Sequence, residues 1–263
     1  MTEGKAQPLP FLPARKNRLV YSIAGRVLVI PQLKRAFGGV YVRVERPALQ
    51  LRRPAPCPVI VCATHSGWWD GHMAYIINER VFHHDGYMMM DNVFLKRLWF
   101  FTYTGIFGID RDDPRKIMAS MRYITHLLQE QPNRALWVFP QGTMRHPDAR
   151  PIAIYGGAAG VARRLGRCVL VPVALRYDFF MEQYPVACAC IGSPIMVDMR
   201  SEPVTTRGLT ARIAEAMTRT ADRLREDVVA YDLRRYRRIL SGRRSIDKAL
   251  ADVLDALSRM VCR

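Results

Sequence analysis

The sequence predicts an α/β fold in which a mainly parallel central sheet is flanked by helices. Three short apolar runs indicate buried strands, at residues 59–62, 135–139 and 168–175. Continuous apolar runs of this length are typical of parallel strands that are covered on both faces. Two stretches of helical character, residues 117–129 and 157–165, separate the three runs. Strands that alternate with helices in this way define the α/β class.

The length of the chain limits the number of domains. A chain of 263 residues is long enough for one sizeable α/β domain with additional segments, and short for two full domains. We therefore expect an α/β core at residues 49–200. Residues 1–48 should form an N-terminal tail and an amphipathic, membrane-facing segment, and residues 201–263 a helical C-terminal extension packed on the core.

An amphipathic helix is predicted near the N-terminus. Leu19, Ile23, Val27 and Ile30 recur at helical spacing, and basic and polar residues form a neighbouring stripe. Pro31 should end or kink this helix, because its ring clashes with the preceding turn. The spacing fits a helix packed on the core and a helix lying in a membrane interface equally well, so both interpretations stay open.

Two further helical stripes follow Pro203. Their apolar positions are Leu209, Ile213, Met217 and Leu224, and then Ile246, Leu250, Val253, Leu257 and Met260. These positions predict two helices separated by a break at Gly242. The Arg-rich run at residues 234–244 between them fits either a solvated helix face or a second contact with phosphate or membrane.

The protein is strongly basic, with a formal net charge of +17 and a pI near 10.1. Such a charge calls for an anionic partner, and both nucleic acid and an anionic membrane qualify. The distribution of charge favours the membrane. The basic residues between Lys5 and Arg46 are interspersed with apolar ones, and the only acidic residues in this part of the sequence are Glu3 and Glu45. We expect an anionic membrane surface as partner and expect no nucleic acid.

The cysteines and the apolar segments indicate where the protein acts. None of the six cysteines forms a CxxC pair, and most lie inside apolar runs, which is typical of reduced thiols in a cytoplasmic protein. The first residues lack the order of a signal peptide. No apolar stretch reaches the roughly 20 residues that a membrane-spanning helix needs. We therefore expect a peripheral protein at the cytoplasmic face of a membrane.

A candidate catalytic pair follows the first predicted strand. That strand leads into His65 and Asp70, in the sequence HSGWWD, and open α/β sheets place reactive groups at the carboxyl ends of their strands. The two side chains can meet if the chain turns after His65 and a helix begins at Asp70, and Gly67 permits such a turn. The carboxylate would then fix the imidazole tautomer and make His65 a general base. A structural histidine is the alternative interpretation of an isolated pair with this spacing.

The sequence offers no protein nucleophile for this base. No serine has the GxSxG frame of a nucleophile elbow, and no cysteine has a neighbouring histidine in the sequence. The hydroxyl of a substrate is therefore the expected nucleophile, and a thioesterase or lipase-like hydrolase is a weaker alternative. No metal ion is expected in the mechanism.

Three further blocks follow His65 and Asp70, at residues 105–111, 138–145 and 171–175. They read GIFGIDR, VFPQGTMR and VPVAL. Together with HSGWWD, and in this order, the blocks resemble the glycerolipid (lysophospholipid) acyltransferase family, which includes the 1-acylglycerol-3-phosphate O-acyltransferases. The resemblance extends over residues 55–195.

The resemblance implies roles for individual residues. His65 would be the general base on the acceptor hydroxyl, oriented by Asp70, and Pro172 would lie near the acyl donor. The acceptor side would comprise Arg111, matched to an arginine that holds the acceptor phosphate, Gly142 and Thr143 in a binding turn, Gln141 and Arg145 beside them, and Lys96 as a weaker correspondence. The donor would be acyl-CoA or acyl carrier protein, used as co-substrate with no further cofactor. Both donors are acidic and suit a basic surface.

The third block departs from the family pattern, which usually reads Phe-Pro-Glu-Gly-Thr-Arg-Ser. Gln141 replaces the glutamate, and Met144 and Arg145 replace the Arg-Ser pair. A neutral amide accepts a hydrogen bond without adding a negative charge, so the departure concerns the acceptor more than the reaction. We expect acyl transfer to a lysophospholipid such as 1-acylglycerol-3-phosphate, in phospholipid biosynthesis. The alternatives are acylation of a glycolipid or sugar-decorated isoprenoid, and a non-catalytic basic lipid- or nucleic-acid-binding module.

Overall fold

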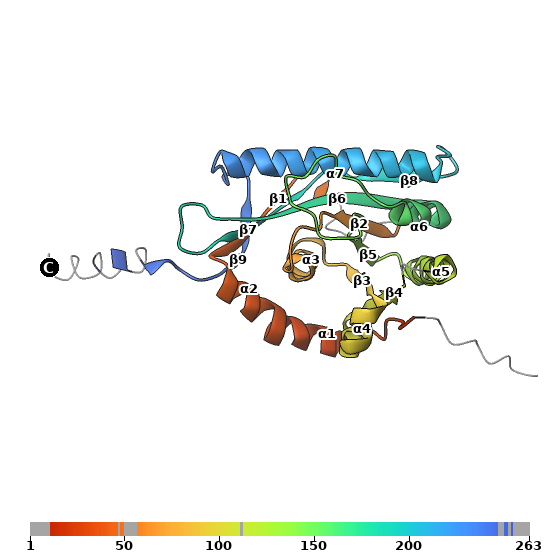
Figure 1. The fold of residues 1–263 in the computed structure, drawn as a ribbon, viewed down its shortest axis with the longest axis horizontal. Coiled ribbons are helices and arrows are strands. Elements are labelled where there is room, and N and C mark those ends of the chain that lie inside the picture. The colour runs from red at the N-terminus through yellow and green to blue at the C-terminus, as the bar shows by residue number, and fades with distance from the viewer. Residues whose placement is uncertain are drawn as a thin grey trace, which may run out of the picture.

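The computed structural model describes residues 11–46, 48–49, 57–110, 113–246, 250–251 and 254. These residues form one nine-stranded sheet with helices on both faces (Figure 1), which confirms the predicted α/β class. The strands are β1 (Gly39–Val44), β2 (Val59–Ala63), β3 (Asp85–Asp91), β4 (Ile106–Ile109), β5 (Arg134–Val138), β6 (Arg167–Asp178), β7 (Val186–Ile191), β8 (Ile195–Asp198) and β9 (Arg237–Ser241).

The centre of the sheet is parallel. The strands run in the order β4-β3-β5-β2-β6-β7-β1-β9, and β8 pairs with β6 outside this path. Every pairing from β4 to β6 is parallel, and β1 also pairs with β7 in parallel. By contrast, β7 and β8 run antiparallel to β6, and β9 runs antiparallel to β1. The carboxyl ends of β2, β5 and β6 therefore lie together at one edge of the sheet.

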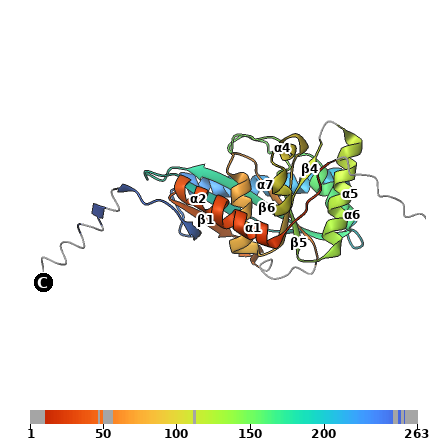
Figure 2. The ribbon, with the colours of Figure 1, turned by 90° about the horizontal axis from the view of Figure 1, so that it is seen from below.

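Helices cover the sheet in two layers (Figures 1 and 2). One layer comprises α5 (Pro114–Glu130), α6 (Gly157–Leu165) and α7 (Thr206–Val229), and we call the sheet face beneath it the α7 face. The other comprises α2 (Ile30–Ala36), α3 (Asp70–Ile77) and its π-helical continuation η3 (Asn78–Phe82), over what we call the α3 face. The chain between β3 and β4 forms α4 (Asn92–Arg97) and the 3-10 helix η4 (Trp99–Thr104).

Side chains of the central strands pack on both faces. On β2, Ile60 and Cys62 belong to the core under α7, whereas Val59, Val61 and Ala63 belong to the core under α3. Successive residues of a strand point to opposite faces. A strand covered on both sides is therefore apolar at every position, which is why the sequence shows it as a continuous run.

The N-terminal helix continues past Pro31, contrary to one part of the prediction. The regular helix α1 (Arg18–Ala24) passes into a π-helical turn, η1 (Gly25–Val29), and Pro31 lies in the first turn of α2. Proline removes one N–H from the interior of this continuous helix, and the π-helical turn directly before it is where the regular helical bonding is interrupted. Gly25 allows close approach to α3, since a Cβ at this position would lie 1.6 Å from the hydroxyl oxygen of Tyr75. Pro31 thus marks an irregularity in the helix and not its end.

The chain after α7 differs from the helical extension that was predicted. The first stripe is buried on α7, as expected. The Arg-rich run, however, contains strand β9 in place of a helix face, and β9 extends the sheet beside β1. Whether a segment forms a strand at a sheet edge depends on the strand beside which it packs, and the local spacing of apolar residues does not reveal that strand. In the second stripe, Ile246 and Leu250 are exposed, whereas Val253, Leu257 and Met260 lie outside the described residues.

The cysteines within the described ranges are all free and buried, as expected for reduced thiols; they are Cys57, Cys62, Cys168, Cys188 and Cys190. Cys262 lies outside those ranges. Among the helices that the structure describes, none has both the length and the apolar character needed to cross a membrane.

Candidate active site

His65 lies where the carboxyl ends of three parallel strands meet. β2 pairs with β5 on one side and with β6 on the other, and His65 follows the end of β2. The preceding residue, Thr64, is held against β6: its N–H donates to the carbonyl of Val173 at 2.9 Å, and its hydroxyl accepts from the N–H of Leu175 at 2.8 Å. The ring of His65 stacks on Phe139, which follows β5, with centroids 4.7 Å apart.

His65 and Asp70 meet, as the sequence predicted. Nδ1 of His65 lies 2.7 Å from Oδ2 of Asp70, because the chain turns at Gly67 and α3 begins at Asp70. A carboxylate only accepts hydrogen bonds, so Nδ1 carries the proton in this pair and Nε2 is the basic nitrogen. His65 is partly exposed and Asp70 is fully buried. His65 is therefore accessible from solvent, while Asp70 is shielded from water.

Asp70 accepts three further hydrogen bonds. The N–H groups of Ser66 and Gly67 donate to Oδ2 at 2.7 and 2.9 Å, and the hydroxyl of Tyr177 donates to Oδ1 at 2.5 Å. A buried carboxylate needs such donors, because a buried charge without partners is costly. Together they fix the position of the group that orients His65.

Tyr177 was not predicted, and it lies 107 positions from Asp70 in the sequence. Burial, reinforced by the Asp70 carboxylate, raises the pKa of Tyr177 well above its usual value, so its hydroxyl stays protonated and donates. The ring stacks on Phe37 of the chain after α2, with centroids 5.6 Å apart. The sequence held one signal: Val173, Leu175 and Tyr177 alternate along β6 and so share one face of this strand.

Gln141 lies in the predicted turn after β5, and its side chain binds the backbone of His65. Oε1 of Gln141 accepts from the N–H of His65 at 2.7 Å, and the N–H of Arg145 donates to the carbonyl of His65 at 2.8 Å. The two bonds tie the turn to the chain on both sides of His65. A glutamate would accept the same bond, so the amide preserves this contact while it removes a negative charge.

The remaining predicted acceptor residues differ in their placement. Gly142 has a φ of +74°, the left-handed conformation that glycine favours, and Thr143 beside it is exposed in the same turn. Lys96 is exposed near the end of α4, and none of the described contacts joins it to His65. Arg111 lies outside the described residues, and its role stays a prediction.

Pro172 occupies the interior of β6. Its carbonyl accepts from the N–H of Gly192 at 2.9 Å, and a Cβ on that glycine would lie 3.1 Å from the proline ring. Alternation along β6 places Pro172 with Ala174 on the α7 face, whereas Phe139, on which His65 stacks, packs on the α3 face. The described contacts do not bring Pro172 to His65, and its role toward the donor stays a prediction.

An apolar cavity of about 470 Å³ lies between α3 and the N-terminal helical segment. It begins beside Trp68 and Gly71, next to Asp70, and continues along β3 and η4 to Met88 and Phe101. Cavities that hold small ligands have volumes of about 300–1,000 Å³ and mainly apolar walls. This space is therefore suited to an apolar ligand.

One polar pair interrupts the wall of the apolar cavity. Nε2 of His72 and Oε1 of Gln32 lie 3.0 Å apart, so the pair connects α3 to α2. Burial lowers the pKa of His72. The imidazole is therefore neutral at pH 7, and the cavity keeps its uncharged wall.

The described residues give His65 no nucleophilic partner of their own. The hydroxyl of Ser66 donates to the carbonyl of Leu175 at 3.4 Å. Burial raises the pKa of Cys62, three positions before His65, to about 12, so this residue stays an unreactive thiol. The arrangement can instead deprotonate a hydroxyl group that a substrate brings to Nε2.

Comparison with known proteins agrees with the predicted family. Residues 48–176 match the family model described as Acyltransferase. Among solved structures, the chain is similar to the 1-acyl-sn-glycerophosphate (LPA) acyltransferase PlsC from Thermotoga maritima, with 15% sequence identity, 79% of each chain covered and a TM-score of 0.49. The comparison with curated proteins gives no match. The matched residues 48–176 contain all four sequence blocks from which this family was predicted.

Proposed function

We propose that the protein transfers a fatty acyl group from acyl-CoA or acyl carrier protein to the hydroxyl of a lysophospholipid such as 1-acylglycerol-3-phosphate. Nε2 of His65 takes the proton of the acceptor hydroxyl, whose oxygen attacks the thioester carbonyl carbon. The carbon–sulfur bond then breaks, and the thiolate leaves with the proton that the imidazolium returns. Asp70 holds the imidazole and stabilises its charged form.

The observation that carries this proposal is the combination of a histidine base, no partner nucleophile among the described residues, and an apolar cavity beside it. Nδ1 of His65 is bound to Asp70, which leaves Nε2 as the base. The cavity starts at Gly71, the neighbour of Asp70. A fatty acyl chain in this cavity would place its carbonyl end near His65, where the acceptor hydroxyl must arrive.

The contact of Gln141 removes an argument for a glycolipid acceptor. The replacement of a glutamate by Gln141 was the main reason to consider a sugar as acceptor. However, Oε1 of Gln141 accepts a hydrogen bond from the N–H of His65. This contact explains why a side chain with a carbonyl or carboxylate oxygen stands at this position, whichever substrate the protein acylates. Arg111 offers the planar fork that binds phosphate, and we assign the acceptor phosphate to it.

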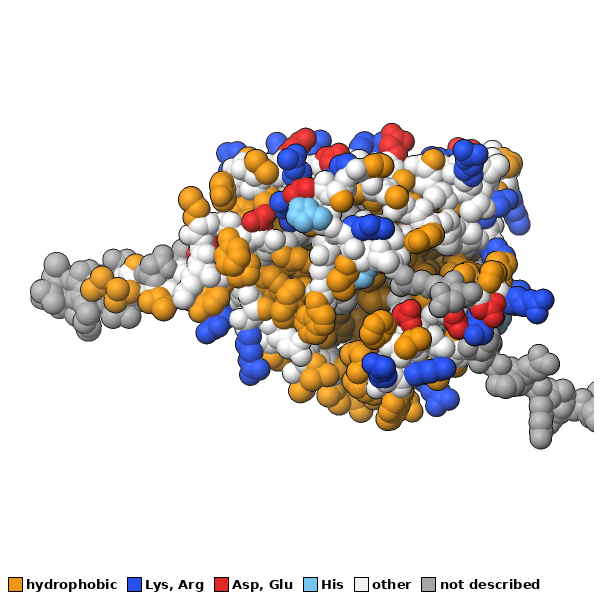
Figure 3. Space-filling view, viewed as in Figure 1, with side chains coloured by type: hydrophobic (Ala, Val, Ile, Leu, Met, Phe, Trp, Pro, Cys, Tyr) orange, Lys and Arg blue, Asp and Glu red, His pale blue; other side chains and the backbone are white. Residues whose placement is uncertain are grey.

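An exposed apolar surface supports action at a membrane. Leu19, Ile23 and Val27 on the N-terminal helix, and Phe94 and Trp99 on α4 and η4, are all exposed. Asn17, which caps α1, donates from its N–H to the carbonyl of Tyr103 at 2.9 Å, so the two segments adjoin. Figure 3 shows hydrophobic side chains on the lower side of the molecule with lysine and arginine around them. Apolar side chains framed by basic ones suit an anionic lipid surface.

The decisive experiment follows a labelled acyl donor. Purified protein is incubated with labelled acyl-CoA, or with labelled acyl carrier protein, and 1-acylglycerol-3-phosphate. We expect labelled phospholipid from the wild type and none above background from His65→Ala. Labelled free acid from the wild type would identify a hydrolase, and no labelled product with either donor would favour the non-catalytic binding module.

The choice of acceptor is tested by Arg111→Ala. With lysophosphatidic acid the variant should lose a charge-assisted contact, and kcat/KM should fall by about 10- to 100-fold. With a neutral glycolipid the variant and the wild type should not differ. A wild type that acylates the glycolipid and ignores lysophosphatidic acid would refute the proposed acceptor and leave the role of His65 intact.

A further inference from the structure

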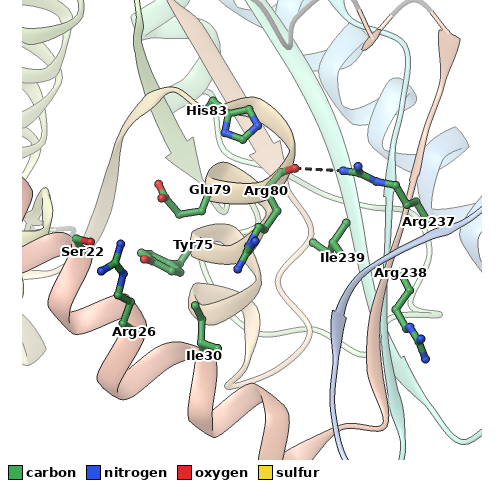
Figure 4. Close-up of a pocket in the computed structure, with 10 residues that line it drawn as sticks. All are labelled: Ser22, Arg26, Ile30, Tyr75, Glu79, Arg80, His83, Arg237, Arg238 and Ile239. Atoms are coloured by element: carbon green, nitrogen blue, oxygen red, sulfur yellow. Dashed lines mark hydrogen bonds between the residues drawn. The ribbon is translucent and has the colours of Figure 1, made fainter.

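A second cavity, of about 550 Å³, opens between η1, the end of α3 and strand β9. Four of the residues that line it are arginines: Arg26, Arg80, Arg237 and Arg238. Figure 4 shows that they come from three elements far apart in the sequence. We call this cavity the arginine groove. The Arg-rich run at residues 234–244 left a contact with phosphate or membrane open, but strand β9, which brings this run beside η1 and η3, was not predicted.

Some arginines in the described part of the chain are paired with carboxylates, and others are not. Examples of paired arginines are Arg43 with Asp227, Arg134 with Glu130, Arg150 with Asp222 and Arg176 with Asp148. None of the four groove arginines has a carboxylate within 4.0 Å among the described residues. Arg26, Arg80 and Arg237 thus bring three positive charges to one cavity, whose lining contains one acidic residue, Glu79. The side chain of Arg238, the next residue of β9, points away from the other three (Figure 4).

Contacts within the groove hold these charges close together. Arg26 and Arg80 flank Tyr75, and both act electrostatically on its hydroxyl. Nη2 of Arg237 donates to the carbonyl of Arg80 at 3.2 Å, which joins β9 to η3 (Figure 4). The acidic residue of the lining, Glu79, accepts a hydrogen bond from Tyr21 at 3.1 Å. A strong anion would therefore find several guanidinium groups and one carboxylate that already has a donor.

The groove is distant from the reacting atoms. Arg80 follows Asp70 by ten positions along α3 and η3, which corresponds to about 15 Å at 1.5 Å per residue. A phosphate beside the hydroxyl that His65 activates cannot reach so far. Arg26, however, lies between Ile23 and Val27 on the helix whose apolar side chains are exposed. The groove therefore borders the proposed membrane-facing surface.

We propose that the arginine groove binds the phosphate of an anionic phospholipid headgroup and so docks the enzyme on anionic membranes. This inference rests on the proposed action at a membrane, and it adds a binding site separate from the acceptor site. Guanidinium groups bind phosphate through paired hydrogen bonds and a full charge. The bound lipid is a component of the surface and not a reactant.

The test is co-sedimentation with phosphatidylcholine vesicles that contain or lack phosphatidylglycerol. The double variant Arg26→Gln/Arg80→Gln removes two groove charges, and no hydrogen bond of either side chain is among the described contacts. We expect its affinity for vesicles with phosphatidylglycerol to fall roughly thirtyfold, the effect of two basic groups near an anionic surface. Its affinity for pure phosphatidylcholine should not change.

The matched control is Arg200→Gln/Arg207→Gln, which removes the same charge beside β8 and at the start of α7, on the other side of the sheet. It should bind both vesicles like the wild type. Glu79→Gln is the opposite test, because it keeps an acceptor for Tyr21 and removes the acidic charge. This variant should bind anionic vesicles about fivefold more tightly.

The outcomes separate the site from the proposals on which it depends. Unchanged binding of the groove double variant to anionic vesicles, or equal losses in the control, would overturn the assignment while membrane action stands. If the wild type binds no vesicle, both the groove assignment and the proposed action at a membrane are wrong. The labelled-donor assay would still test acyl transfer. A groove variant that loses binding of free coenzyme A and keeps its affinity for anionic vesicles would show that the groove holds donor phosphates instead.

Discussion

The two faces of the sheet use amphipathic helices differently. On α7, Leu224 is 1% exposed, and the other members of its apolar stripe are also buried. On the N-terminal helix, Leu19 is 68% exposed and Val27 64% exposed, although the two stripes have the same helical spacing. The helix on the α7 face completes a core. The N-terminal helix leaves part of its apolar side open to a partner outside the protein.

The same contrast holds for polar groups. Each face has a tyrosine that donates to a carboxylate: Tyr177 to Asp70 on the α3 face, and Tyr236 to Asp227 on the α7 face. Asp227 also binds an arginine in an ion pair, whereas Asp70 binds the partly exposed His65. One carboxylate belongs to a structural network and the other to a site that solvent and substrate can reach. We therefore expect substitutions on the α7 face to change stability, and those on the α3 face to change catalysis and binding.

The largest effect should come from Asp70→Asn. The amide keeps the size of the side chain but no longer stabilises the imidazolium of His65, so kcat should fall by about 10²–10⁴. The matched control is Asp227→Asn on the α7 face, with kcat close to that of the wild type. The measurement is kcat for both variants, with circular dichroism as a check of folding. Wild-type turnover in Asp70→Asn would show that this carboxylate does not orient the base.

Leu224→Ala and Leu19→Ala compare the two helices directly. Removing the buried Leu224 leaves a cavity and should lower the free energy of unfolding by about 2–5 kcal/mol. Removing the exposed Leu19 should change it by no more than about 0.5 kcal/mol. Urea unfolding of both variants measures the difference. Equal losses would mean that the N-terminal helix is as fully packed in solution as α7.

Tyr177→Phe and Tyr236→Phe remove the two tyrosine–carboxylate hydrogen bonds. Each bond to a charged group contributes about 1.5–3 kcal/mol, so both variants should be less stable by similar amounts. Tyr177→Phe alone should also lower kcat, by about tenfold, because Asp70 then holds His65 less firmly. Stability by denaturation and kcat at saturating substrate separate the two effects. A kcat loss of the same size in Tyr236→Phe would remove the distinction between the faces.

The smallest effect should come from Val27→Ser and Val229→Ser. Both valines are 64% exposed, one on the N-terminal helix and the other at the end of α7. Burial of a valine side chain contributes about 1.5 kcal/mol, so Val27→Ser should weaken vesicle binding by up to about tenfold. Val229→Ser should not change it. Identical binding of both variants would place the membrane contact elsewhere.

Local patterns in the sequence identified much of the core and the candidate catalytic pair. The central strands appeared as continuous apolar runs because they are covered on both faces, and α7 appeared as a periodic stripe that proved to be buried. His65 and Asp70 were identifiable because they are five positions apart, with Gly67 between them to allow the turn. Features of this kind depend on neighbours in the chain, which the sequence displays directly.

Other features depend on residues far apart in the chain, and only the tertiary structure decided them. Tyr177 reaches Asp70 across 107 positions, and Gln141 binds the N–H of His65 because β5 and β2 are adjacent. The arginine groove exists because β9 returns to the sheet beside β1. The sequence by itself determined the class of fold, the resemblance to the acyltransferase family and the meeting of His65 with Asp70. The supporting contacts and the choice between a buried and an exposed helix face required the packing, because helical periodicity specifies which residues share a side and not what that side meets.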